Sequence, residues 1–352
     1  MNGYKIKFSG VDRLFDDYSW RLSRRAKSVW QSGEVLQGKY LSTLEKEIAK
    51  KYSRKYAIGV GSATDGLYFA MRALGLNGQS TVLCPAFSYV ATAGAIKRLG
   101  ADIHFADTDK QGNIGDWGVV GLPDAVVYAN MFGNLADYTR LKQYCKKHKI
   151  PLIEDAAQSQ GAMYGSKPSG SLGDISVFSF DPMKNMPSFG TAGMVLTDSK
   201  DVYDSIVSLR RHAFGGDMEY GYNSLISEDH ANQLLFLLTK FDRLQKMRQN
   251  VFMRYKKLLP HLDFIETRKD TKSSYHKLVM LSNRRDELKT YLQHNGIETK
   301  IHYVKTLDSN NIGVYPNAEN ICAKALSLPI YPHLKMDEVN YICKKIQKFH
   351  GI

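Results

Sequence analysis

Short β-rich runs alternate with helical patterns over residues 57–197, and this alternation constrains the fold more than any other feature of the sequence. The β-rich runs read YAIGVG, TVLCP, DIHFAD, AVVYAN, PLIED, ISVFSF and GMVLTD, and helical patterns begin near residue 65, cover about 90–99 and lie near 135–148. Strands that alternate with helices form βαβ units, in which parallel strands lie side by side under a helical cover. The pattern therefore predicts an α/β fold with a mostly parallel central sheet and helices on both faces.

A second, smaller domain is expected after this region. Residues 228–259 form a long amphipathic helical pattern, apolar on one side and basic on the other. After it, YHKLVML and IETKIHY are expected as strands, with a helix near 285–295 and a final helix from about Lys335. A chain of 352 residues, 43% of them hydrophobic, can bury a large core and divide in two. We expect a large domain over residues 1–245 and a small C-terminal α/β domain over residues 246–352.

Composition narrows the environment and the partners of the chain. The net charge of +13 favours anionic partners, but the Lys and Arg pairs are dispersed and not gathered with aromatic residues, so we expect no nucleic-acid role. The four cysteines form no CxxC pair, so neither a disulfide framework nor a zinc site is indicated. Residues 1–10 lack the apolar core of a signal peptide, and no apolar run approaches the ~20 residues that span a bilayer. We expect a cytoplasmic protein without a membrane partner.

The stretch GVGSATDGLYFAMRALGL predicts an anion site. It places a Gly-Ser-Ala-Thr turn between a strand and a helix, where free backbone N–H groups and the positive helix end face one point. The alternative is that Ser62, Thr64 or Asp65 only caps the helix. The stretch matches neither a Walker loop nor GxGxxG, so it gives little support to a nucleotide-phosphate or NAD site.

Two carboxylates and a lysine follow neighbouring strands. Glu154 and Asp155 end PLIED, and Lys184 follows ISVFSF, with Ser179 just before it. By themselves the carboxylates are compatible with a metal site, acid–base catalysis or a turn. An amine able to condense with an aldehyde, an acid to hold a protonated pyridine nitrogen and a helix-end phosphate site are together what pyridoxal phosphate requires.

These stretches resemble the DegT/DnrJ/StrS-type family of pyridoxal-phosphate-dependent sugar aminotransferases. The resemblance runs from SGEVLQGKYLSTLEKEIAKKY through PAFSYVATAGAIKRLGADIHFAD and IPLIEDAAQSQGAMYGSKPSGSLGDISVFSFDPMKN to GYNS, GIETKIHY and LSLPIYPHL, and thus covers nearly the whole chain. It implies the aspartate-aminotransferase-like fold (fold type I) and pyridoxal 5'-phosphate as cofactor.

The resemblance also implies roles for single residues around the cofactor ring. Lys184 is similar to the lysine that attaches the cofactor and moves a proton between cofactor and substrate carbons. Asp155 matches the acid that pairs with the ring nitrogen, Gln158 the residue beside the phenolic oxygen and Tyr89 the aromatic residue that stacks on the ring. Without the resemblance, Tyr89 would be taken as a core residue and Gln158 as a polar residue at a helix start.

Further positions match the phosphate and sugar ends of the family's site. Ala63, Thr64 and Ser179 match residues that bind the phosphate. Asn223, in YGYNSL, matches an asparagine that reaches the phosphate across a subunit boundary, which implies a homodimer with shared active sites; otherwise it is a turn residue. His302 and Tyr303 match the segment that lines the sugar end, although an isolated histidine is more often structural.

The expected activity is transfer of an amino group from glutamate to a nucleotide-linked keto sugar in amino-sugar biosynthesis. The length of KNMPSFGTAG favours amination of the sugar's third carbon over its fourth. Two alternatives remain: a sugar dehydratase of the same family, which would carry histidine in place of Lys184, and a catalytically inactive binding or regulatory relative. The sequence departs from the family pattern at Thr191 and Ala192, where an acid is missing, and at Leu225, where an arginine is common.

Overall fold

The computed structural model describes residues 3–116, 121–214, 220–308 and 313–352. The chain begins with two helices, α1 (Val11–Ser32) and α2 (Lys39–Lys51). The central region contains β1 (Tyr56–Val60), α3 (Ala63–Ala73), β2 (Thr81–Pro85), α4 (Val90–Leu99), β3 (Asp102–Ala106), β4 (Ala125–Ala129), the 3-10 turn η1 (Met131–Gly133), α5 (Tyr138–His148), β5 (Leu152–Asp155), β6 (Met163–Tyr164), β7 (Lys167–Pro168), β8 (Ile175–Ser179), β9 (Gly193–Thr197) and α6 (Lys200–Leu209). The C-terminal region contains α7 (Glu228–Leu258), β10 (Thr271–Lys272), β11 (Leu278–Leu281), α8 (Arg285–His294), α9 (Pro316–Lys324), β12 (Ala325–Leu328) and α10 (Met336–His350).

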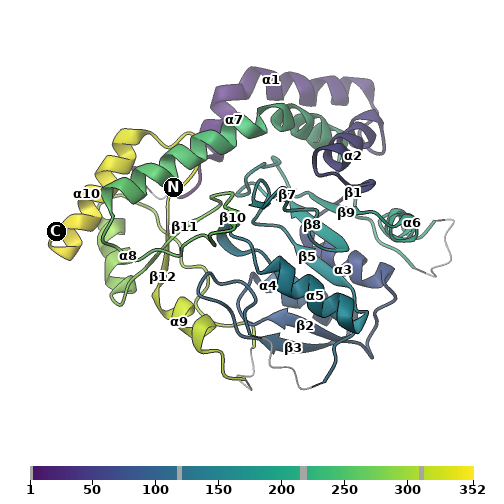
Figure 1. Cartoon of the computed structure of the whole chain (residues 1–352). Helices are drawn as coiled ribbons and strands as arrows, with labels where there is room; N and C mark the ends of the chain where they lie inside the picture. Colours follow the sequence, from purple (N-terminus) through teal and green to yellow (C-terminus); the bar gives the residue numbers. More distant parts are fainter. Residues whose placement is uncertain (1–2, 117–120, 215–219, 309–312) are drawn as a thin grey trace.

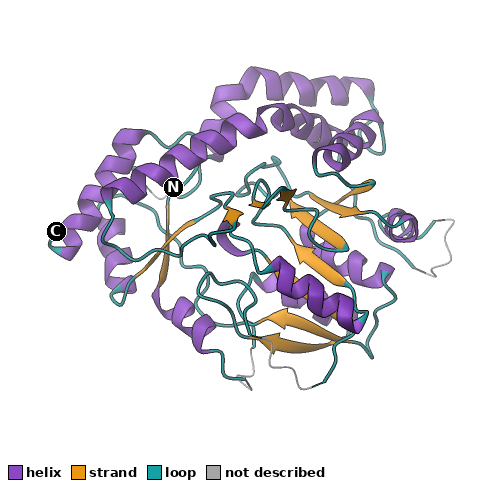
Figure 2. Cartoon of the chain, viewed as in Figure 1, coloured by secondary structure: helices purple, strands orange, loops and turns teal. Residues whose placement is uncertain are grey.

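The central sheet confirms the α/β prediction. Its seven strands lie in the order β1-β9-β8-β5-β4-β2-β3, and β9 runs antiparallel to both of its neighbours while the other pairs are parallel. The carboxyl ends of β1, β8, β5, β4 and β2 therefore share one edge of the sheet, and β9 begins there (Figures 1 and 2). Ligands of open α/β sheets bind at this edge.

Helices cover both faces of the sheet, as expected. Side chains of a strand alternate between the two faces. Ile58 and Val195 point into a core with α3, α4 and α6, whereas Ala57 and Leu196, their neighbours in the chain, point into a core with α1, α2 and α7. Helix α5 covers the second face farther along the sheet, through a cluster that contains Leu141 and Leu152. The sheet is therefore buried on both sides, and its polar strand ends lie at the edge.

The long helix α7 connects two hydrophobic cores and agrees with the predicted pattern at 228–259. Its first part, up to Leu244, packs against α1 and α2, and its last part, from Val251, packs in a separate cluster with α8, α10, β11 and β12 (Figure 1). The change of core between these two residues supports our proposal of a domain boundary near residue 245.

The C-terminal region differs from the sequence expectation at IETKIHY and in additional elements, among them α9 and β12. The IETKIHY stretch forms no strand; Ile297 and Lys300 make only isolated bridges, to Ile6 and Ser327. The second strand of this region is instead β12, which pairs antiparallel with β11. Through Ile6, the N-terminal segment joins the core of the C-terminal region.

No helix within the described ranges is long and apolar enough to cross a membrane.

Candidate active site

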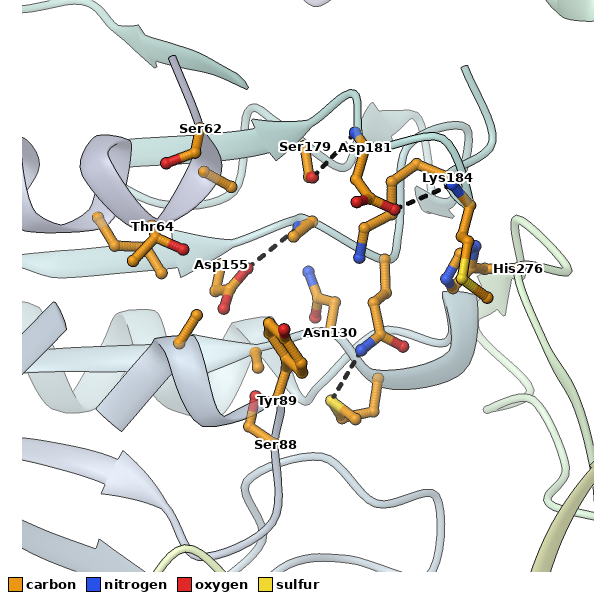
Figure 3. Close-up of a pocket in the computed structure, with 18 of the residues that line it drawn as sticks. Ser62, Thr64, Ser88, Tyr89, Asn130, Asp155, Ser179, Asp181, Lys184 and His276 are labelled. Carbon is orange, nitrogen blue, oxygen red and sulfur yellow. Dashed lines mark hydrogen bonds between the residues drawn. The ribbon is translucent and has the colours of Figure 1, made fainter. Parts of the chain in front are cut away.

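A cavity of about 390 Å³ opens where the strand ends meet, and it collects nearly all of the expected site residues (Figure 3). The expected residues that line it are Ala63, Thr64, Tyr89, Asp155, Gln158, Ser179, Lys184, His302 and Tyr303. Asn223 does not line it; this residue is exposed and bridges to Arg211 beyond α6.

The N-terminus of α3 forms one wall of the cavity. Ser62 caps the helix by accepting a hydrogen bond of 3.1 Å from the Asp65 N–H, so the capping alternative holds for Ser62. Ala63 and Thr64 follow in the first turn, where backbone N–H groups have no partner inside the helix. The helix dipole and these donors make the wall suited to a phosphate.

Backbone packing and a serine hold this turn in place. A Cβ atom on Gly193 would lie 2.6 Å from the Ala63 nitrogen, so β9 can approach the turn only with glycine as its first residue. On the other side, the Ser224 hydroxyl donates to Asp65 at 2.8 Å and accepts from the Gly61 N–H at 2.9 Å. The GYNS segment thus fixes the turn and leaves Asn223 exposed.

The two carboxylates of β5 have different surroundings because adjacent side chains of a strand point to opposite faces. Glu154 is fully buried and accepts hydrogen bonds from the Asn130 amide, the Ser169 and Ser176 hydroxyls and the Gly170 and Leu172 N–H groups. Its role is structural. Asp155 lines the cavity.

The neighbours of the buried Asp155 carboxyl only partly stabilise its ionised form. Its side chain accepts a hydrogen bond of 2.8 Å from the Thr92 hydroxyl and one of 3.1 Å from the Ala157 N–H. Burial raises the pKa of the Asp155 carboxyl, against the opposing influence of these bonds and of Lys184. A cation placed in the cavity would stabilise the ionised form.

Lys184 lies across the cavity from Asp155 on a tight turn after β8 (Figure 3). The Lys184 N–H donates to the Asp181 carbonyl at 2.9 Å, and the Asp181 carboxylate accepts from the Met183 N–H at 2.9 Å. Burial lowers the pKa of the Lys184 ammonium, while Asp155 and Asp181 oppose the shift. A lysine with a lowered pKa is a better nucleophile and proton acceptor.

Asn185 ties the lysine turn to the C-terminal region. Its side-chain amide donates to the carbonyls of Gln160 and Ser274 at 3.2 and 3.0 Å, and its oxygen lies 3.0 Å from His276 Nδ1. His276 is buried, and burial together with nearby cations lowers its pKa well below the ordinary value. These contacts fix the position of Lys184 relative to both regions of the chain.

Polar and aromatic side chains complete the cavity. Gln158 accepts from the Phe132 N–H at 3.1 Å and donates to the Tyr303 hydroxyl at 3.3 Å. Tyr89 is 53% exposed and its ring centre lies 6.0 Å from that of Tyr303, so one face remains free for a planar ligand. His302 bonds to Ser327 at 2.9 Å, and burial lowers its pKa to about 3.

Several residues of the site were not expected from the sequence. Thr92 positions Asp155, Asn185 fixes the lysine turn, Ser224 holds the phosphate-facing turn, and Lys277 lines the cavity. Thr92, Asn185 and Ser224 lie inside stretches that carry the family resemblance. Nothing in the sequence around Lys277 marks it as a cavity residue, because its position depends on how the C-terminal region packs.

The chemistry of this set fits the pyridoxal 5'-phosphate that the resemblance implies. The α3 terminus suits a phosphate, Asp155 needs a cationic partner such as a protonated ring nitrogen, and Lys184 offers an amine in the same cavity. Across the described part of the chain, no group of three or more His, Cys, Asp and Glu side chains is arranged to hold a metal ion.

Comparison with known proteins agrees with this chemistry. The model of the family described as "DegT/DnrJ/EryC1/StrS aminotransferase family" matches residues 20–347. A protein of Geobacillus stearothermophilus named pleiotropic regulatory protein is 31% identical and the match covers 97% of each chain. The dTDP-3-amino-3,4,6-trideoxy-alpha-D-glucose transaminase of Streptomyces venezuelae is 26% identical over 98% of this chain and 96% of the relative. Among solved structures, that of DesV from S. venezuelae has a TM-score of 0.93 at 26% identity, with 98% of each chain covered.

Proposed function

The chain belongs to the DegT/DnrJ/EryC1/StrS aminotransferase family, and we propose that it transfers an amino group from glutamate to a nucleotide-linked keto sugar with pyridoxal 5'-phosphate as cofactor. The observation that carries this proposal is the presence of Lys184, Asp155 and the α3 N-terminus around one cavity. The relative from S. venezuelae is named a transaminase of a dTDP-linked 3-amino sugar, which supports a nucleotide-linked sugar as substrate and is our reason to favour a 3-keto sugar.

When bound, pyridoxal 5'-phosphate supplies an aldehyde that takes up the amino group of the donor and an aromatic ring that withdraws electrons from the reacting carbon. Asp155 holds the ring nitrogen protonated, so that the ring can withdraw electrons. Lys184 attaches the cofactor and afterwards, as a free amine at Nζ, moves the proton between the reacting carbons.

The remaining cavity residues bind and orient. The backbone N–H groups of Ala63 and Thr64 and the hydroxyls of Thr64 and Ser179 bind the phosphate. Gln158 donates toward the phenolic oxygen, and Tyr89 stacks on the ring with its exposed face. His302 and Tyr303 line the side from which the sugar enters.

Two copies of the chain are proposed to share their sites. Asn223 is exposed and lies outside its own cavity, which leaves it available to the phosphate site of a second subunit. Val90, which follows Tyr89 in the chain, is 63% exposed and leaves apolar surface uncovered beside the cavity. We propose a homodimer, the commonest symmetric assembly.

The activity is tested by incubating the protein with pyridoxal 5'-phosphate and glutamate, and then with a panel of keto-sugar nucleotides. We expect the amine form of the cofactor and 2-oxoglutarate in the first step and an amino sugar in the second. Glutamine offered in place of glutamate tests the donor. Absence of 2-oxoglutarate with every donor would contradict the proposal.

Lys184→Arg tests the central residue. Arginine keeps the charge but cannot be deprotonated, so it can neither attach the cofactor nor move the proton. Borohydride reduction should no longer fix the cofactor to the protein, as measured by mass spectrometry, and amino transfer should fall by about 10²–10⁴-fold or more. A Lys184→Arg protein with wild-type transfer would refute the assigned role.

A binding or regulatory role is the second candidate, since the relative with 31% identity is named a regulatory protein. The same glutamate assay separates the two, because a non-catalytic relative would form no 2-oxoglutarate. The dehydratase alternative expects histidine in place of Lys184, and this chain has the lysine.

A further inference from the structure

Lys277 contributes a second lysine to the cavity, at the end away from the phosphate-facing wall. Figure 3 shows Ser62 and Thr64 on one side of the cavity and Lys184 and His276 on the other. Lys277 follows His276 in the chain, just before β11, and also lines the cavity. Its backbone N–H donates to the Phe132 carbonyl at 3.1 Å, so the position of the residue is fixed by the fold.

The Lys277 ammonium has no carboxylate partner in the described ranges. No ion pair joins Lys277 Nζ to an Asp or Glu oxygen within 4.0 Å in these ranges, and Nζ lies 4.8 Å from the centre of the Phe8 ring. The Asp181 carboxylate favours the charged form of Lys277 from a distance and accepts a hydrogen bond from the Met183 N–H. The protein around Lys277 therefore supplies no paired carboxylate to stabilise its charged form.

A buried arginine adds to the positive charge at this end. Arg248 is 5% exposed and donates to the carbonyls of Ile330 and His276 at 2.8 and 3.4 Å, while its Nε has no partner. Arg248, Lys184 and Lys277 together line a small cavity of about 40 Å³ that adjoins the main one. Burial, Lys184 and Arg248 lower the pKa of the Lys277 ammonium well below its ordinary value. A bound anion would relieve this repulsion.

The cofactor does not account for this positive end. Its phosphate is matched by the α3 terminus and its ring nitrogen by Asp155, and Asp155 is not among the charged groups that influence the pKa of Lys277. The anion that fits here belongs to the substrate, and the adjoining space of about 40 Å³ between Lys277 and Arg248 favours a small one. A carboxylate has the charge and the size, and a lysine binds it as a point charge.

We propose that Lys277 is a specificity residue that binds a carboxylate of a substrate at the end of the cavity beside Lys184. The proposal rests on the aminotransferase function above and adds a substrate feature to it. The carboxylate has two sources: the amino donor, or a keto sugar that carries an acid group.

Binding to the pyridoxal-phosphate-loaded protein, measured by calorimetry, tests the proposal with three probes. Glutarate represents the donor's carboxylates, UDP-glucuronate an acidic sugar, and UDP-glucose the same nucleotide sugar without the acid. In Lys277→Gln we expect the dissociation constant to rise about 10- to 100-fold for glutarate, or for UDP-glucuronate relative to UDP-glucose, because a charge-assisted contact is lost. The probe that responds identifies the source.

Two further variants control for folding and for general charge. Lys277→Arg keeps the charge and should retain part of the affinity. Lys272→Gln removes an exposed lysine from the same segment outside the cavity and should change nothing. Thermal unfolding of all variants confirms that they fold.

Three results would overturn the proposal: unchanged affinity of Lys277→Gln for both acids, equal weakening of UDP-glucuronate and UDP-glucose with glutarate unaffected, or no binding of either acid by the wild-type protein. These results are distinct from failure of the proposed function, which shows as absence of 2-oxoglutarate when the wild-type protein is given glutamate.

Discussion

The position of Asp155 suits a bound cation but makes the ligand-free folded protein less stable. The strand that ends in PLIED is buried, and the cavity gives its last carboxylate only two hydrogen bonds. Because burial raises its pKa, the ionised group is less stable in the folded, cofactor-free protein than in the unfolded chain. A protonated ring nitrogen would reverse this imbalance.

Asp155→Asn should therefore stabilise the cofactor-free protein at neutral pH and weaken cofactor binding. In the unfolded chain, an Asp carboxyl titrates at pH ~3.9. As the pH rises from this value through the raised pKa of the folded state, the wild-type protein loses stability because its folded form holds the proton more tightly. The asparagine side chain of the variant does not titrate, so the variant lacks this loss. Urea unfolding at several pH values should show a stability difference that grows from acid to neutral pH. The dissociation constant of the cofactor should rise about 10- to 100-fold. A less stable variant at pH 7 would contradict this account.

At the scale of the element, β5 buries Glu154 in the fold and turns Asp155 into the cavity, while the first residue of β9 packs against the turn at Ala63. Both results follow from the two-residue period of a strand and from close packing at its end. The sheet edge is therefore part of the site, and small changes in these strands should affect ligand binding.

Glu154→Gln should destabilise the fold, in contrast to the change one residue later. The amide brings two N–H donors toward a position that already receives donors from Ser169, Ser176 and the segment 170–172. We expect a loss of about 3 kcal/mol in the free energy of unfolding, measured by urea denaturation. Equal effects of the Glu154 and Asp155 variants would show that the two sites are not distinct.

Gly193→Ala should disturb the turn at Ala63. The new Cβ atom would lie 2.6 Å from the Ala63 nitrogen, which requires a shift of backbone atoms. We expect a destabilisation of about 1–3 kcal/mol and weaker binding of the cofactor, measured by urea unfolding and by cofactor titration. Gly94→Ala is the matched control, since Gly94 lies at an exposed position of α4 and no atom lies within 4 Å of its added Cβ. That change should leave cofactor binding as it is and stabilise the helix by about 0.5–1 kcal/mol.

At the scale of the whole molecule, the cavity is built from both regions of the chain. The large sheet supplies the phosphate wall, Asp155 and Lys184, while the C-terminal region supplies His276, Lys277, His302 and Tyr303. Asn185 joins the two through its bonds to Gln160 and Ser274. We propose that the exposed Asn223 also contributes to the cavity of a second subunit.

Mixing two inactive variants tests the shared site. If Asn223 serves the partner's cavity, a dimer of Lys184→Ala and Asn223→Ala chains has one intact site and one doubly defective site. Random reassociation should then restore roughly a quarter of the wild-type transfer, since half of the dimers are hybrids. Sedimentation analysis should show a dimer for each variant. Mixtures that regain no transfer would place Asn223 in its own subunit or outside the site.

The sequence alone was enough to predict the mostly parallel sheet, the long helix near 228–259, and Lys184, Asp155 and the α3 turn as candidates at one edge. These follow from local periodicity and from the rule that parallel strands end at the same edge. Tertiary structure decided that Glu154 is buried among hydrogen-bond donors away from the cavity, that Thr92 and Asn185 hold the functional side chains, and that Lys277 lines the same cavity as Lys184. It also replaced the expected strand at IETKIHY with β12. The physical reason is that these features depend on contacts between segments far apart in the chain, such as Asn185 with Ser274, which no local pattern encodes.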